Sequence, residues 1–349
     1  MKARRLIVGK TSGVEIETFE VPEPGPGEVV IRVNRSQISA GSETSGYLSA
    51  LSGTGDKTLN PGVKSGPTGY NTIGRVLTVG PGMKEYKPGD RVMTFGNHGS
   101  HWLTGQPSRT GSTIAPSIQR IEYDLTDEQA AFSRLGDVAM HGVRRGEIQV
   151  DESVVVFGQG VVGQLTTAFC RVSGAYPVVA VDIDAGRLEL AKKSGATHTV
   201  DASKEDAIEA VKQITGGGAE CAFHATRLAQ TFLDCIAAAA IRGKVVVIGF
   251  PRESLELNLR PEFLKKELQI RASNAAIGIE NNVHPYWRWT LQRARTSIMR
   301  MIADGDIKVD HLISHVAKPE EADALYRKMA AGPTGWMSIF FDWEDEAGD

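Results

Sequence analysis

Cysteine is scarce in this chain, and its few cysteines are not spaced as a binding motif. The 349 residues include only Cys170, Cys221 and Cys235, and no CxxC pair. So small a number argues against a disulfide framework and against a cysteine zinc cluster. It also favours a reducing compartment, for which we expect the cytoplasm.

Long apolar runs and an excess of one charge are also lacking. The longest wholly apolar stretch, residues 235–241, has seven residues, whereas a membrane-spanning helix needs about twenty. The chain has 39 Lys and Arg against 42 Asp and Glu, a net charge of −3. The short apolar runs therefore predict no membrane partner, and the lack of a basic excess predicts no nucleic-acid partner. The first residues do not have the pattern of a signal peptide.

The apolar residues that are present follow two patterns along the chain. Before residue 120, short apolar runs such as 29–33 and 74–79 are separated by Gly and Pro turns, which predicts mostly β structure. From about residue 126, where Thr126 and Gln129 form a capping box, strand and helix patterns alternate. The strands there, such as 154–157, are continuously apolar, as in a parallel sheet buried on both faces. The expected fold class is therefore α/β, with about two domains.

A glycine-rich turn stands between one of these strands and the next helix. Gly158, Gly160 and Gly163 match GxGxxG, and the strand before and helix after them are those of a dinucleotide-binding turn. The first glycine permits the tight turn, the second lets the backbone approach a pyrophosphate, and the third lets helix and strand pack closely. The helix N-terminus at Val161 and Val162 offers N–H groups to the anion.

An acidic residue follows at the spacing that ribose binding requires. Asp182 lies 19 residues beyond Gly163, at the end of the next predicted strand, where a carboxylate binds the adenosine ribose hydroxyls. Its charge would repel a 2′-phosphate, so NAD is expected rather than NADP, although Arg187 nearby can accommodate that phosphate. Ile248 and Gly249, at the end of a later strand, complete the expected cofactor site.

Several segments, taken in order, carry a wider resemblance. They are residues 24–29, 74–80, 88–92, 158–163, 195–196 and 312–315. Together they resemble the medium-chain dehydrogenase/reductase superfamily, the alcohol dehydrogenase-like proteins. The resemblance implies a GroES-like β domain formed by residues 1–138 and 277–349, and an inserted, doubly wound Rossmann domain at residues 139–276. It also implies an oxidoreductase whose catalytic cleft lies between the two domains.

The chain departs from the zinc-dependent members at the metal ligands. By the resemblance, the ligand positions and the acid beside them hold Ala40, Tyr70 and Asn71, and a later ligand position holds Asp137. A catalytic zinc needs about three protein ligands, so one carboxylate is not enough. We therefore expect no metal, and a general base in place of a Lewis acid.

Four residues are candidates for this proton chemistry. By the resemblance Asp137 points toward the vacant metal position, where a buried carboxylate can take a proton. His141, four residues on, can share its helix face. Tyr70 replaces a ligand histidine and can bind a substrate oxygen, and Ser42 matches the hydroxyl that passes the alcohol proton outward. Each also has an ordinary structural role: a surface Asp, a core His, a packed Tyr and a loop Ser.

The remaining polar candidates suggest the kind of substrate. Glu43, Asn71 and His98 are expected to contact it, and such a polar set indicates a sugar, cyclitol or similar secondary alcohol oxidised with NAD. Two alternatives stay open: an NADPH-dependent reductase of quinones or enones, and an NAD-binding protein without catalysis. Relatives commonly join their Rossmann sheets edge to edge, and residues 244–249 and 268–273 can do so here. We therefore expect a homodimer or homotetramer.

Overall fold

The chain divides into two compact units in a computed structural model. It describes residues 1–9, 13–52, 66–104, 118–249, 251, 254–275, 289–332 and 335–344. Unit 1 comprises Met1–Ser133 and Ile313–Asp349, and unit 2 comprises Arg134–Leu312. The first boundary lies close to the expected residue 138. The second differs from the expected one, because residues 289–312 group with unit 2 although the sequence placed everything from 277 onward in the other domain.

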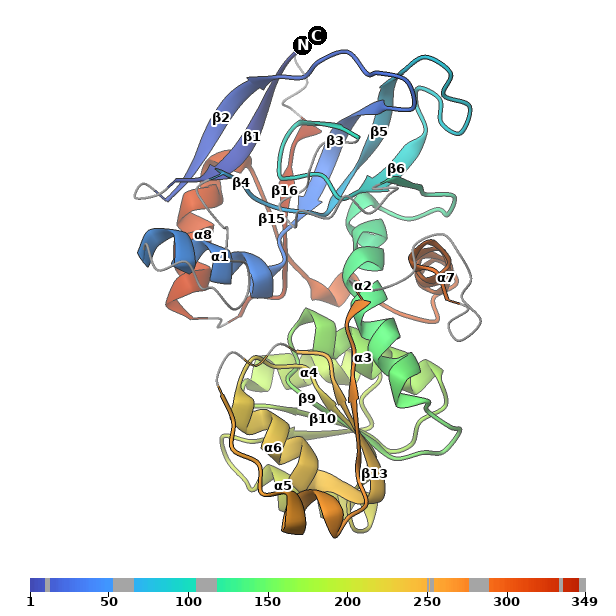
Figure 1. The fold of residues 1–349 in the computed structure, drawn as a ribbon, viewed down its shortest axis with the longest axis vertical. Helices are drawn as coiled ribbons and strands as arrows, with labels where there is room; N and C mark the ends of the chain where they lie inside the picture. The colour runs from blue at the N-terminus through green and yellow to red at the C-terminus, as the bar shows by residue number, and fades with distance from the viewer. Residues whose placement is uncertain are drawn as a thin grey trace. The chain divides into compact units, whose positions relative to one another are not determined.

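Unit 1 is built on two largely antiparallel sheets (Figure 1). Its strands are β1 (Lys2–Val8), β2 (Val14–Glu20), β3 (Val29–Gln37), β4 (Gly66–Pro67), β5 (Thr72–Val79), β6 (Arg91–Thr94), β7 (His101–Leu103), β8 (Ile118–Arg120), β15 (Ile313–Ala317) and β16 (Ser338–Asp342). The smaller sheet has the order β2-β1-β4. The larger has the order β15-β16-β3-β5-β6-β8, with β7 paired to β3. Strands from both ends of the chain therefore form one sheet.

Helices cover this β framework and close its core. They are α1 (Ala40–Ser52), the start of α2 (Asp127–Gly146) and α8 (Ala322–Ala331), which follows the short helix Pro319–Glu321. Alternate residues of β3, such as Ile31 and Val33, pack with Leu325 of α8 and Phe341 of β16. The predicted capping box is confirmed, because Thr126 Oγ1 accepts the Gln129 N–H at 3.1 Å and Gln129 Oε1 accepts the Thr126 N–H at 3.0 Å.

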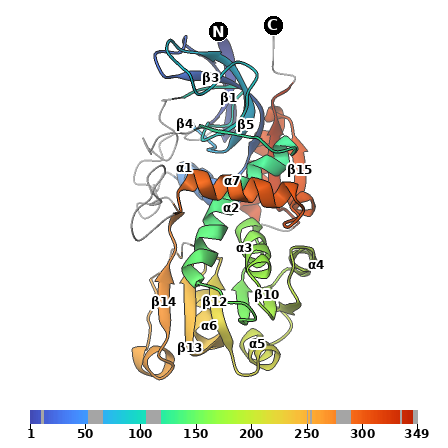
Figure 2. The same ribbon diagram turned by 90° about the vertical axis from the view of Figure 1, so that its right-hand side faces the viewer.

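Unit 2 is a six-stranded parallel sheet with helical connections. Its elements are β9 (Val154–Phe157), α3 (Val161–Val172), β10 (Val178–Asp182), α4 (Ala185–Lys193), β11 (His198–Asp201), α5 (Ala207–Thr215), β12 (Ala219–His224), α6 (Ala229–Ala238), β13 (Ala239–Val247), a π-helical segment (Leu259–Leu264), β14 (Gln269–Ala272), α7 (Leu291–Ala303) and a 3₁₀ turn (Asp310–Leu312). The strand order is β11-β10-β9-β12-β13-β14, and Figure 2 labels β14, β13, β12 and β10 in turn across this sheet. The order reverses between β9 and β12, which confirms the doubly wound topology and marks the point where such sheets bind ligands.

The apolar strand runs explain the core of unit 2. Val155, Val179 and Val245 lie on one face of the sheet and pack against Val211 of α5 and Phe232 of α6. The inner strands β9 and β10 are buried on both faces, so their residues have no need to alternate between apolar and polar.

One helix of unit 2 starts at the end of the segment that predicts it. Residues 203–206 predict a helix start, and α5 begins at Ala207. The reason is that the Asp206 side chain accepts the N–H groups of Ile208 and Glu209, so it caps the helix.

Candidate cofactor and substrate residues

The glycine turn joins β9 to α3 at the switch point of the sheet. Gly158 has φ of +91°, which favours glycine, and a Cβ there would lie 2.5 Å from Thr226 Cγ2. At Gly163, a Cβ would lie 1.8 Å from the carbonyl oxygen of Gly158. The first and third glycines are therefore required by the packing of the turn itself.

The second glycine faces open space. A Cβ on Gly160 would meet nothing within 4 Å. Gly160 is also the N-cap of α3, in extended conformation, and as a glycine it provides no side-chain bond to the first N–H groups of the helix. Val161 and Val162, which start α3, are only half-buried. The turn therefore offers an anion both room and N–H donors at the positive end of a helix dipole, and its residues fit a dinucleotide pyrophosphate.

Asp182 is fastened to this turn from the neighbouring strand. One carboxylate oxygen accepts the Gln159 N–H at 2.6 Å, and the other accepts the N–H groups of Ile183 and Asp184 at 2.8 and 3.0 Å. Arg187 Nη1 lies 3.9 Å from the first oxygen. The acid and the basic residue that the sequence indicated are thus brought together beside the phosphate-binding turn.

Ile183 was not among the residues expected to bind the cofactor. Ile183 directly follows Asp182 in the chain, and its side chain is 71% exposed. It therefore offers an apolar surface next to the carboxylate, on which the planar base of a dinucleotide could pack. An apolar residue in an otherwise polar turn was the signal that could have revealed it.

Two further strand ends carry buried polar atoms without a partner among the described residues. These are His224 Nδ1, at the end of β12, and Ser273 Oγ, just beyond β14. Burial lowers the pKa of His224, although the Leu228 carbonyl and Asp234 act in the opposite direction. Buried polar atoms normally have a partner, so a ligand or an ordered water is expected at these two positions.

Ile248 and Gly249 follow β13, between those two strand ends. The Ile248 side chain is 3% exposed. It packs so closely on Gly142 that a Cβ added to that glycine would clash with it. Gly249 donates its N–H to the His224 carbonyl at 2.9 Å, and a Cβ there would lie 1.8 Å from the carbonyl oxygen of Thr226. Both residues are therefore closely packed at this end of the sheet. A cofactor could contact their backbone or the small exposed part of the Ile248 side chain.

Asp137 and His141 lie on α2 within unit 2 and have different surroundings. Asp137 Oδ1 accepts from Arg134 Nη1 at 2.9 Å, and Oδ2 accepts from Arg295 Nε at 2.8 Å. Both oxygens that a base would use are thus engaged by guanidinium groups. Burial and the charges of Arg145 and Arg144 lower the pKa of His141, although Asp137 raises it. The His141 imidazole is therefore neutral near pH 7.

Three residues expected to contact substrate lie inside unit 1. The side chains of Glu43, Asn71 and His98 are 1%, 2% and 0% exposed. Asn71 Nδ2 donates to Gln37 Oε1 at 2.7 Å and to the Ala131 carbonyl at 3.0 Å. Glu43 and His98 bond to each other at 2.9 Å. Each of these side chains is therefore enclosed and has a partner within the chain, and direct contact with a substrate stays a prediction for them.

Ser42 and Tyr70 are the two hydroxyl candidates of unit 1 that reach its surface. Ser42 is exposed on the first turn of α1, and Tyr70 is half-buried just before β5. Each is next to a deeply buried neighbour, Glu43 and Asn71 respectively.

The side chains at the family's metal-ligand positions do not form a zinc donor set. Ala40 has no donor atom, Asn71 Nδ2 is engaged in internal hydrogen bonds, and Asp137 is paired with two arginines. Within the described ranges, no three His, Cys, Asp or Glu side chains gather as they would around a metal ion. These residues do not fit a catalytic zinc.

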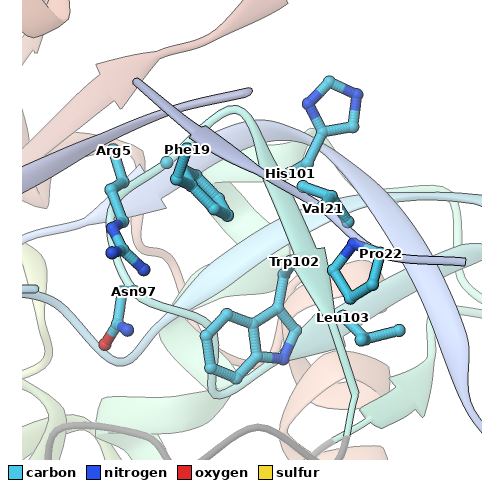
Figure 3. Close-up of a pocket in the computed structure, with 9 residues that line it drawn as sticks. Arg5, Phe19, Val21, Pro22, Asn97, His101, Trp102 and Leu103 are labelled. Carbon is cyan, nitrogen blue, oxygen red and sulfur yellow. The ribbon is translucent and has the colours of Figure 1, made fainter. Parts of the chain in front are cut away.

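Unit 1 also contains a small pocket away from these residues (Figure 3). The Arg5 guanidinium stacks over the Phe19 ring at 4.5 Å, and Asn97 and Trp102 line the same hollow. Asn97 Oδ1 and Trp102 Nε1 are buried without a partner in the part of the chain that is described. The volume of about 10 Å³ holds roughly one water molecule, so this is no substrate pocket.

Comparison with known proteins finds a family match that starts at the first residue of α3. A family profile described as "Zinc-binding dehydrogenase" matches residues 161–292. The chain is 28% identical to (R,R)-butanediol dehydrogenase of Bacillus subtilis, over 70% of this chain and 77% of that protein. It is 25% identical to sorbitol dehydrogenase of the same organism, over 94% of each.

The solved structures share the fold. An Escherichia coli oxidoreductase/dehydrogenase of unknown specificity superposes with a TM-score of 0.80 at 18% identity, covering 98% of this chain and 99% of the other. At that identity the likeness shows the fold alone. None of the described helices combines the length and the apolar character that crossing a bilayer requires.

Proposed function

Because this chain belongs to the medium-chain dehydrogenase/reductase superfamily, we propose that it transfers a hydride between a secondary alcohol and NAD. The observation that carries the proposal is the carboxylate of Asp182, held 2.6 Å from the Gln159 N–H in the phosphate-binding turn. The proposed substrate is a sugar, cyclitol or similar polar alcohol. Its support is the relatives named above, which are butanediol and sorbitol dehydrogenases.

The residues of unit 2 divide the work of binding the cofactor. The N–H groups of Val161 and Val162 would hold the pyrophosphate beside Gly160. Asp182 would accept hydrogen bonds from the ribose hydroxyls. NAD, when bound, supplies the hydride acceptor.

We assign the proton transfer to His141. Its lowered pKa keeps the imidazole neutral at pH 7, and a neutral imidazole can accept the alcohol proton. Asp137 is a weaker candidate, because its two oxygens already accept from arginines. Ser42 and Tyr70 remain the proposed ligands of the substrate oxygen. The side chains at the ligand positions give no zinc site, so the reaction is proposed to proceed without that metal.

One observation favours the reductase alternative. Arg187 Nη1 lies 3.9 Å from Asp182 Oδ2, so a cation is close to where a 2′-phosphate would lie. An NADPH-dependent reductase of quinones or enones therefore stays as the second candidate, and an NAD-binding protein without catalysis as the third.

The deciding experiment measures nicotinamide absorbance with metal-stripped enzyme, NAD and a panel of sugars and cyclitols. We expect NADH to accumulate with at least one of them. Consumption of NADPH with quinones or enones, and no reaction with any alcohol, would replace the proposal by the reductase. Binding of NAD with no turnover of any substrate would support the third candidate.

A pair of histidine variants tests the assigned base. His141→Gln should bind NAD as the parent does and lose about 100-fold or more in kcat, within the usual range for a general base. The matched control is His198→Gln, since His198 is an exposed histidine of the same unit. Equal activity in the two variants would remove His141 from the mechanism.

We further propose that two copies pair through the β14 edge of the parallel sheet. Among the described strands β14 bonds to β13 alone, and Ile270 on it is 39% exposed. Such an edge is a template for another strand. Ile270→Glu should halve the mass seen in sedimentation, whereas Val150→Glu, at an 83% exposed position of unit 2, should not. An unchanged mass with Ile270→Glu contradicts this interface.

A further inference from the structure

Unit 1 encloses a network of polar side chains that the proposed reaction leaves unexplained. His98 is fully buried, and its ring nitrogens lie 2.8 Å from Ser36 Oγ and 2.9 Å from Glu43 Oε2. The same Glu43 oxygen accepts from Tyr326 Oη at 2.5 Å and from Thr68 Oγ1 at 3.1 Å. So many bonds on one buried carboxylate make it a rigid junction between distant parts of the chain.

Glu43 fastens the start of α1 to this junction. Its second oxygen, Oε1, accepts the Ser39 N–H at 2.7 Å, and the Glu43 N–H donates to the Ser39 carbonyl at 2.9 Å. The other oxygen, Oε2, lies 2.9 Å from His98 Nε2, so the two buried side chains share a hydrogen bond. Ser42 directly precedes Glu43 in the chain, so the hydrogen bonds of the Glu43 carboxylate also fix the position of Ser42.

His98 fixes the turn that precedes Tyr70 in the same way. Its N–H donates to the Thr68 carbonyl at 2.7 Å. Gly69 has φ of +91°, and a Cβ there would lie 2.6 Å from His98 Cγ, so the imidazole lies directly on the glycine. Because Thr68 also bonds to Glu43, the turn is held at both its backbone and its side chain.

We propose that the buried His98–Glu43 pair is a positioning device, which holds the segment carrying Ser42 and the segment carrying Tyr70 at a fixed separation. The two hydroxyls reach the surface of unit 1, while the pair that sets their separation is sealed beneath them. This inference rests on the proposed function, in which those hydroxyls bind the substrate oxygen. A shift of about 1 Å in such groups can cost roughly 100-fold in rate.

Three variants separate positioning from simple stability. His98→Phe keeps a ring against Gly69 and Phe341, which His98 contacts edge-on at 5.2 Å between ring centroids, but it removes both hydrogen bonds. His98→Gln retains an N–H donor for Glu43. The matched control is Ser314→Ala, which removes a hydrogen bond to the Ser338 carbonyl in unit 1 without touching the network.

The measurements are kcat, the KM values for alcohol and NAD, and hydrogen exchange of the amides in residues 39–44 and 66–71. His98→Phe should lower kcat about tenfold or more with the KM for NAD within about twofold, and His98→Gln should recover most of the loss. Amides of both segments should exchange faster in His98→Phe while the rest of unit 1 stays protected. If His98→Phe does not fold, Tyr326→Phe removes one donor to Glu43 and should loosen the same two segments.

Two results would overturn the inference. One is a His98→Phe enzyme with parental kcat and parental exchange in both segments. The other is a loss of activity no larger than that of Ser314→Ala at equal loss of stability. If the parent protein oxidises no alcohol, the proposed function has failed, and hydrogen exchange of the two segments is then the measurement that tests the positioning role. Loosening confined to the two segments then supports positioning, and uniform loosening of unit 1 contradicts it.

Discussion

Arg295 Nε donates to Asp137 Oδ2 at 2.8 Å, and the two side chains are 4% and 0% exposed. The pair joins α7 to α2 within unit 2, and Arg134 adds a second ion pair at 2.9 Å on the other carboxylate oxygen. Charges buried so deeply are tolerated only because each has a partner, so the loss of one partner is costly. Asp137 is thus more important to the structure than the sequence alone indicated.

Removing the carboxylate should therefore destabilise the protein. Asp137→Ala is expected to lower the free energy of unfolding by about 3–5 kcal/mol, because it leaves the Arg295 guanidinium buried beside it. Arg295→Met should cost a similar amount, and the double variant should cost clearly less than the sum. Urea unfolding followed by circular dichroism measures all three. Additive losses would mean that the pair is not coupled.

Substitutions of two glycines in the phosphate-binding turn should have different effects, one on the stability of unit 2 and the other on NAD affinity. Gly163→Ala places a Cβ 1.8 Å from the Gly158 carbonyl oxygen and should unfold or strongly destabilise unit 2. Gly160→Ala meets no protein atom within 4 Å, so its melting temperature should be parental while NAD affinity falls about tenfold or more. Calorimetry and NAD titration test the two. A destabilised Gly160→Ala with parental NAD binding would contradict this division.

Much of the fold was readable because local patterns matched the final environment. Continuously apolar strands lie in a sheet buried on both faces, and the turn around Gly158 stands where strand, turn and helix predicted it. Other elements were missed for the same reason. Helix α1 has the sequence AGSETSGYLSALS, in which serine and glycine obscure any helical pattern, and the sequence predicts no helix there.

The candidate site was less predictable, because its partners are far apart in the chain. His98 meets Glu43 across 55 residues, and Arg295 meets Asp137 across 158. A sequence shows that such residues are polar but not which of them bond to one another. It therefore suggested substrate contact for side chains that the fold encloses.

The Asp182 carboxylate should set the preference between the two nicotinamide cofactors. Asp182→Asn keeps an oxygen for the Gln159 N–H but removes the charge that repels a 2′-phosphate. We expect the KM for NAD to rise about tenfold and the KM for NADP to fall. Arg187→Ala should act in the opposite direction on NADP. Steady-state kinetics with both cofactors decides, and a parental ratio in Asp182→Asn would dismiss this carboxylate as the selectivity determinant.

Buried histidines should make unit 2 less stable in mild acid. Burial lowers the pKa of His224 despite its bond to the Leu228 carbonyl, so the unfolded chain takes up a proton at a higher pH than the folded one. The contribution to stability is full above about pH 6.5 and is lost as the pH falls toward the lowered pKa, at about 1.4 kcal/mol for each unit of depression. His224→Gln should flatten the decline between pH 7.5 and 5.5 in urea unfolding. His198→Gln, at an exposed position of the same unit, should leave the decline unchanged, and equal slopes in all three proteins would refute this role for His224.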